Sequence, residues 1–166
     1  GNLDQINIEK HYYYLNKLIN NLSNMYNKKA VVCVHPNDNL ELKKKYFPNI
    51  EVVQYQTTEN IYKAFLVLFI ESSAIVDAIL LKKRILNLIS NFSGENAINY
   101  TLEWAKRVGF LRINIEDELK INNNKLLSKL DDAKKNYSNY IKSFIAPDGN
   151  NIGCEKIIKT LKERFF

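Results

Sequence analysis

The sequence predicts an α/β fold, an open parallel sheet of about five strands flanked by helices, with additional helices at both ends of the chain. From about residue 30 to residue 115, short β-branched runs alternate with helical patterns, and the connections between them are short. Strands that alternate with helices in this way form parallel sheets through right-handed crossovers. We therefore divide the chain into an N-terminal helical segment (1–29), a parallel α/β core (30–115) and C-terminal helices that pack on the core (116–166).

The individual elements follow from local patterns along the chain. Strands are expected at residues 30–34, 50–54, 66–70, 84–89 and 110–113. Helices are expected at residues 11–25, 40–46, from 59, from 72 to about 82, at 95–108, 125–144 and 152–165. Thr57 or Thr58 can cap the helix from 59, and Asn150 or Asn151 can cap the last one. The strand at 66–70 is apolar on both faces, which favours a central place in the sheet.

Composition excludes several classes of protein. The chain has 166 residues, of which 46% are hydrophobic, and this is too apolar for a disordered protein. Its longest apolar run, 64–70, is far shorter than the roughly 20 residues of a membrane span. Cys33 and Cys154 do not have the spacing of a metal or CxxC site, and a reducing, cytoplasmic location is the default expectation.

The net charge of +6 is compatible with an anionic ligand, a nucleic acid or an acidic membrane surface. Lysine supplies most of this charge, whereas phosphates and bases are usually read by arginine forks. We therefore expect no nucleic-acid partner. The terminal helix carries lysines beside an apolar face, which allows a peripheral membrane contact, although packing of that face on the sheet is the favoured interpretation.

Polar loops follow each of the first four expected strands. Ligands of open parallel sheets bind at this edge, beyond the carboxyl ends of the strands. The residues found there are His35 and Pro36, then Tyr55, Gln56, Thr57, Thr58 and Glu59, then Glu71, Ser72 and Ser73, and finally Ser90 to Ser93.

Two of these loops suggest an anion site. Ser72 and Ser73 at a helix start can offer hydroxyl and backbone N–H groups to a phosphate, although serine is also an ordinary helix cap. His35 has a fixed backbone direction because Pro36 follows it, and its imidazole can donate to a phosphate oxygen or can be structural. Their occurrence at one edge of the sheet favours a shared anionic ligand.

Three segments of the chain resemble a known family. Val32–Pro36, Thr58–Tyr62 and Leu68–Ala78 are similar to the Rossmann-like carboxyl half of GT-B glycosyltransferases that make bacterial surface polysaccharides. The nearest groups are bacterial sialyltransferases and polysialyltransferases, whose HP and SS motifs hold the phosphate of CMP. The CDP-glycerol glycerophosphotransferases share a similar arrangement. The resemblance covers roughly residues 30–90.

The resemblance implies roles for particular residues. His35 would bind the donor phosphate and stabilise the leaving group, and Ser72 and Ser73 would bind the same phosphate. Glu59 is the candidate for the ribose. Pro36, Tyr55 and Gln56 would complete the nucleotide site, the last two as base contacts. The implied reaction is inverting transfer from a CMP-sugar with no further cofactor and no obligatory metal, and the sequence has no Asp-x-Asp pair.

The same family takes its general base and much of its acceptor site from an amino-terminal domain. This chain is too short to contain one, so either it is the donor-binding half of a longer enzyme or the resemblance does not extend to activity. The expected location is the cytoplasm, which is compatible with a peripheral contact at the inner face of the membrane. The isolated chain is expected to bind nucleotide weakly and to transfer nothing to a glycan. A CDP-glycerol transferase-like domain, half of a sugar-nucleotide 2-epimerase and a noncatalytic α/β interaction module are the alternatives.

Overall fold

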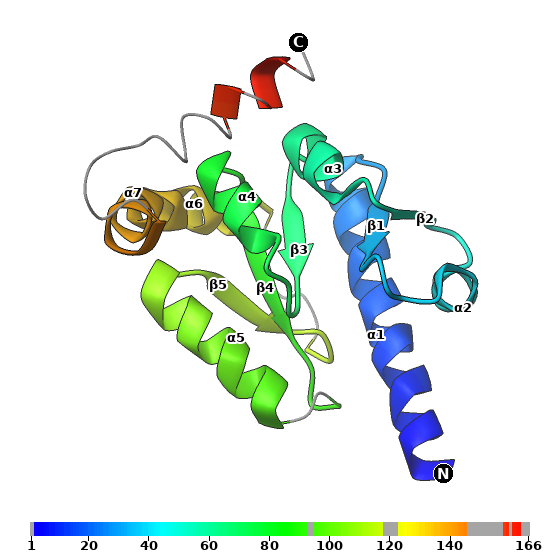
Figure 1. Cartoon of the computed structure of the whole chain (residues 1–166). Coiled ribbons are helices and arrows are strands. Elements are labelled where there is room, and N and C mark those ends of the chain that lie inside the picture. Colours follow the sequence, from blue (N-terminus) through cyan, green and yellow to red (C-terminus); the bar gives the residue numbers. More distant parts are fainter. Residues whose placement is uncertain (1, 93–94, 118–122, 146–157, 160, 164–166) are drawn as a thin grey trace.

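The computed structural model describes residues 2–92, 95–117, 123–145, 158–159 and 161–163 (Figure 1). Its strands are β1 (Val31–Val34), β2 (Glu51–Gln54), β3 (Val67–Phe69), β4 (Ile85–Ile89) and β5 (Leu111–Asn114). The helices are α1 (Asn2–Tyr26), α2 (Leu40–Tyr46), α3 (Thr57–Lys63), α4 (Ile75–Leu80), α5 (Glu95–Val108), α6 (Asn123–Ala133) and α7 (Tyr137–Tyr140). A 3-10 turn, Lys134–Asn136, precedes α7, and a π turn, Ile141–Ile145, follows it.

The α/β class with parallel strands is confirmed, but the expected single sheet is not. β1 and β2 form one parallel sheet, and β3, β4 and β5 form another in that order. Within the described residues, no main-chain hydrogen bonds join β1 to β3. β3 pairs over three residues with β4 and leaves its other edge without a ladder, and this divides the strands into two groups.

The central strand of the larger sheet is β4, not the third strand as expected. β4 pairs with β3 from Val67 to Phe69 and with β5 from Leu111 to Asn114. Its first four residues, from Ile85 to Leu88, are buried. The apolar character of the third strand therefore came from packing against helices, because an edge strand that is covered on both faces is as apolar as a central one.

The core lies on both faces of β4. On one face, Leu86 and Leu88 pack with the buried side of α1, with Val34 of β1 and Val52 of β2, and with α6. On the other face, Ile85 packs with residues of α3, α4 and α7, including the fully buried Tyr137. Each fully buried leucine contributes roughly 1.5–3 kcal/mol. Since α1 contacts strands of both sheets, one core holds the two sheets together.

Local signals account for several helix boundaries. Asn39 begins α2 because its side chain accepts a hydrogen bond of 3.0 Å from the N–H of Leu42. Gly109 ends α5 with a φ of +76°, and a Cβ at this position would lie 2.4 Å from Nδ2 of Asn136. The left-handed backbone therefore favours glycine here, and a Cβ would also displace the side-chain amide of Asn136.

The flanks agree in part with the sequence analysis. The N-terminal helix starts earlier than expected, and the expected helix at 125–144 is divided among α6, α7 and the turns beside them. The cap of the terminal helix at Asn150 or Asn151 and most of that helix lie outside the described residues, but Leu161 is buried. No described helix has the length and apolar character that crossing a bilayer requires.

Candidate functional site

The loops that follow β1 and β3 lie toward the same side of the molecule. Figure 1 shows both strands with their carboxyl ends directed to the lower half of the view, where the N-terminal end of α1 also extends. His35 and Pro36 follow β1, and Ser72 and Ser73 follow β3. All four residues are exposed. The structure thus leaves their side chains accessible to a ligand at this edge.

The imidazole of His35 has a defined hydrogen-bonding pattern. Its Nδ1 atom accepts a hydrogen bond of 3.1 Å from the N–H of Asn37. A neutral imidazole that accepts at Nδ1 carries its proton on Nε2. The backbone carbonyl of His35 accepts a second bond, of 2.9 Å, from the N–H of Asp38. The turn therefore presents Nε2–H as a hydrogen-bond donor at the end of β1.

Gln54 holds this turn from the neighbouring strand. Its Nε2 atom lies 3.0 Å from the carbonyl oxygen of His35, 2.9 Å from that of Pro36 and 3.1 Å from that of Asp38. Gln54 can reach them because it is paired in register with Val34, the last residue of β1. Sequence reasoning overlooked this role, since Gln54 was assigned only to a strand.

The two proposed base contacts differ in their surroundings. Tyr55 adopts a φ of +63° and is 76% exposed, and its hydroxyl donates a hydrogen bond of 3.3 Å to the carbonyl of Pro36. Gln56 is exposed at the N-cap of α3, without a side-chain capping bond. Tyr55 therefore borders the His35 turn from the β2 side, whereas Gln56 is placed at the start of α3.

The serine pair does not begin a helix as the sequence predicted. α4 starts at Ile75 and has six residues, with Ala74 at its N-cap. Ser72 and Ser73 form the preceding turn, in which their carbonyls accept the N–H groups of Ile75 and Val76 at 3.3 and 3.2 Å. The Oγ of Ser72 accepts the N–H of Ala74 at 3.3 Å, which leaves its hydroxyl proton available. The hydroxyls remain donors, but a helix this short adds little dipole.

The expected cap of α3 is also different. Thr58 lies in the first turn, and its hydroxyl donates a hydrogen bond of 2.7 Å to the carboxylate of Asp77 in α4. Glu59, the candidate for the ribose, forms an ion pair of 2.5 Å with Lys63 on the same helix. Thr58 thus joins α3 to α4, whereas Glu59 pairs with a lysine of its own helix.

Asn87, on the neighbouring strand β4, hydrogen-bonds the main chain at the end of β3. It is fully buried on β4, and its side-chain amide lies 3.3 Å from the carbonyl of Phe69 and 3.4 Å from that of Ile70. Its Oδ1 atom has no hydrogen-bond partner. A buried amide with an unsatisfied oxygen costs free energy. Its two donor contacts fix the point where the chain leaves β3 toward Ser72.

The two halves of the candidate site are connected only indirectly. Among the described residues, no hydrogen bond or ion pair joins His35 to Ser72 or Ser73. The connection runs from the His35 turn through Gln54 and Tyr55 to α3, and from Thr58 to Asp77 in α4. A ligand that bound both His35 and the Ser72–Ser73 turn would therefore connect the two loops directly.

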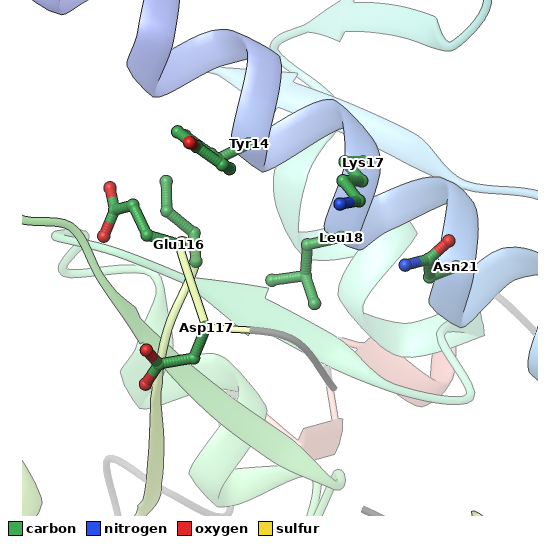
Figure 2. Close-up of a pocket in the computed structure, with 7 residues that line it drawn as sticks. Tyr14, Lys17, Leu18, Asn21, Glu116 and Asp117 are labelled. Carbon is green, nitrogen blue, oxygen red and sulfur yellow. The ribbon is translucent and has the colours of Figure 1, made fainter. Parts of the chain in front are cut away.

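A separate pocket lies between α1 and the chain after β5 (Figure 2). It has a volume of about 270 Å³ and is lined by Tyr14, Lys17, Leu18, Asn21, Ile115, Glu116 and Asp117. The sequence analysis did not find it, because α1 and β5 meet only in the folded chain. The available signal was the polar character of the loops after β4 and β5, Ser90–Asn91 and Asn114–Asp117.

Within the described parts of the chain, no group of three or more His, Cys, Asp or Glu side chains is placed to hold a metal ion. Comparison of the sequence and the structure with protein-family models, curated proteins and solved structures finds no match. The function must therefore be argued from the geometry of the chain itself and from the motifs that it contains.

Proposed function

We propose that this chain is the donor-binding domain of a GT-B glycosyltransferase that transfers a CMP-activated, sialic acid-like sugar to a surface glycan. The HP and SS motifs support this proposal, since both lie exposed in loops at the carboxyl ends of parallel strands. Nucleotides bind at this edge in open α/β sheets. The exposed imidazole of His35, whose Nδ1 accepts the N–H of Asn37 and whose Nε2 is left for a ligand, is the observation that carries the proposal.

In this proposal, the leaving phosphate accepts hydrogen bonds from Nε2 of His35 and from the hydroxyls of Ser72 and Ser73. Negative charge grows on the phosphate as the bond to the sugar breaks, and fixed donors stabilise that charge without reorganising. Gln54 and Asn87 act as positioning residues, because they fix the main chain at the two loops and do not touch the ligand. Tyr55 and Gln56 would contact the base, and Glu59 would need to leave Lys63 to reach the ribose.

The acceptor and its general base are assigned to a domain outside this chain. The proposal therefore expects the chain alone to bind nucleotide and to transfer no sugar, and it implies a cytoplasmic location, where nucleotide donors are made. A CDP-glycerol donor is the second candidate, since it offers the same cytidine and phosphate groups.

Calorimetric titration of the 166-residue chain with CMP, CDP, UDP and GDP tests the proposal. We expect the cytidine nucleotides to bind at least about tenfold more tightly than UDP or GDP, a difference of about 1.4 kcal/mol. A preference for CDP over CMP would favour the glycerophosphotransferase type. A uridine preference would overturn the proposal in favour of an epimerase-like domain, and no binding of any nucleotide would favour a noncatalytic interaction module.

A further inference from the structure

The pocket between α1 and the chain after β5 has two differently built walls (Figure 2). Tyr14, Leu18 and Asn21 lie on one stripe of α1, at spacings of four and three residues, and Lys17 lies beside them. The other wall is the segment Ile115–Asp117. Leu18 and Ile115 are each 4% exposed and form an apolar base, so the polar groups of the pocket stand at its rim.

The wall after β5 is held in a fixed conformation. Oε1 of Glu116 accepts a hydrogen bond of 2.6 Å from the hydroxyl of Ser90, and Oε2 accepts one of 3.1 Å from the N–H of Asn91. The N–H of Glu116 donates to Oδ1 of Asn114 at 3.0 Å. These hydrogen bonds link the loops after β4 and β5 and fix the position of the Glu116 carboxylate in this wall.

Groups of opposite charge line the two walls of the pocket, with Lys17 on α1 and Glu116 and Asp117 on the segment after β5. Figure 2 shows Lys17 and Asn21 on the α1 wall and the carboxylates of Glu116 and Asp117 across from them. Within the described chain, Lys17 and Asp117 form no ion pair and no side-chain hydrogen bond. Lys17 and Asp117 are both exposed, so their charges are available to a ligand at the rim of the pocket.

We infer that this pocket binds a small zwitterion that carries an ammonium group and a carboxylate. The carboxylate of the ligand would lie against Lys17, with the amide of Asn21 as a further donor. Its ammonium group would lie against Asp117 and Glu116. A volume of about 270 Å³ suits an unbranched amino acid, since drug-sized ligands occupy larger pockets. This inference does not depend on the proposed nucleotide site.

The test is a titration of the isotope-labelled 166-residue chain, in which binding is monitored by amide chemical shifts. The probes are glycine, β-alanine, γ-aminobutyrate and 5-aminovalerate, which separate the same two charges by increasing distances. Propionate and propylamine each carry one of the charges. We expect at least one zwitterion to shift the amides of Tyr14–Asn21 and Ile115–Asp117, and to bind roughly tenfold more tightly than either single-charge compound.

Variants assign the two contacts. Lys17→Gln and Asp117→Asn should each weaken binding of that zwitterion by roughly tenfold, because each removes one charged hydrogen bond. Both residues are exposed, so the substitutions should not unfold the chain. Lys10→Gln, at an exposed lysine earlier in α1, is the matched control and should leave binding unchanged. Shifts that are absent from the pocket amides, or equal binding of propionate or propylamine, would overturn the inference.

Discussion

The hydroxyl of Thr58 donates a hydrogen bond of 2.7 Å to the carboxylate of Asp77 and thereby joins α3 to α4. Both residues are half-buried, so the bond is partly shielded from water. It is the direct hydrogen bond between the helix after the Tyr55–Gln56 loop and the helix after the Ser72–Ser73 loop.

Thr58→Val keeps the shape of the side chain and removes the donor. We expect the free energy of unfolding to fall by about 1–2 kcal/mol, because the substitution leaves a partly buried carboxylate without its hydrogen bond. Urea denaturation measures this change. Thr58→Ser retains the hydroxyl and should stay within about 0.5 kcal/mol of the parent chain; equal losses in the two variants would show that packing, not the hydrogen bond, is responsible.

Gln54→Leu removes the amide that contacts the three carbonyls of the His35 turn. We expect CMP affinity to fall by about three- to tenfold, since the turn loses its main-chain support while the imidazole itself is unchanged. Calorimetry measures the affinity. Gln56→Leu, at the exposed N-cap of α3, is the companion variant and tests a base contact. A Gln54→Leu variant with full CMP affinity would remove Gln54 from the list of positioning residues.

His35→Ala and the double variant Ser72→Ala/Ser73→Ala test the phosphate donors. Each should weaken CMP binding by roughly tenfold or more, because hydrogen bonds to a charged acceptor are worth about 1.5–3 kcal/mol. Cytidine, which lacks the phosphate, supplies the control. Its binding should be the same in the parent chain and in both variants, and a parallel loss for cytidine would mean that the loops had collapsed.

His11 makes the stability of the chain depend on pH. Burial lowers its pKa below the ordinary value of 6.5, and the negative charge of Glu116 opposes part of this shift. The folded state therefore binds fewer protons than the unfolded state just below pH 6.5. The contribution is complete above this value and is lost as the pH falls toward the lower pKa of the folded state. Urea midpoints between about pH 7.5 and pH 5.5 should decline, and His11→Gln should flatten that decline.

Asp131 makes the stability of the chain depend on pH in a more acidic range. Hydrogen bonds from Arg84, with further help from Lys134, hold its pKa below the ordinary value of 3.8. Its stabilising effect is therefore complete above pH 3.8 and disappears as the pH falls through the lower folded-state pKa. The Arg84 pair is bidentate, at 2.9 Å for both bonds, but the Asp131 side chain is 40% exposed.

Solvent screening at this exposure limits the effect of Asp131→Asn to about 1 kcal/mol at pH 7. Thermal unfolding at pH 7 measures the effect, and we expect it to vanish when the two proteins are compared near pH 2. Asp132→Asn is a suitable control, because within the described residues Asp132 forms an ion pair with the exposed Lys135 on the same helical segment and with no other residue. A difference that persists at low pH would show that the substitution acts through packing.

Local patterns predicted the order of the elements well. The helix at 95–108 has the predicted bounds, since its first and last turns are marked by polar and glycine residues. The helix start at Ser72 was wrong because the chain makes an additional turn before Ile75, and serine favours both situations. Thr57 or Thr58 was predicted to cap the helix from 59, but α3 already begins at Thr57, and Thr58 bonds Asp77, a residue that only the tertiary fold brings near.

Nonlocal features escaped prediction for one physical reason. Which strand is central, whether two strands share a ladder, and which side chains line a pocket all depend on contacts between distant segments. Lys17 and Asp117 line the same pocket although most of the α/β core lies between them in the sequence. Nothing in the spacing of either residue shows this, whereas the exposed HP and SS loops could be found because strand ends are visible locally.

The boundary between β1 and β3, where no ladder joins the two sheets, affects how the sheets can move relative to each other. Only side chains span it in the described structure, so a small slide of one sheet along the other breaks no main-chain hydrogen bond. We therefore expect the separation between His35 and Ser73 to be less firmly fixed than separations within either sheet. A phosphate bound to both His35 and Ser73 would link the loops of the two sheets and restrict their relative movement.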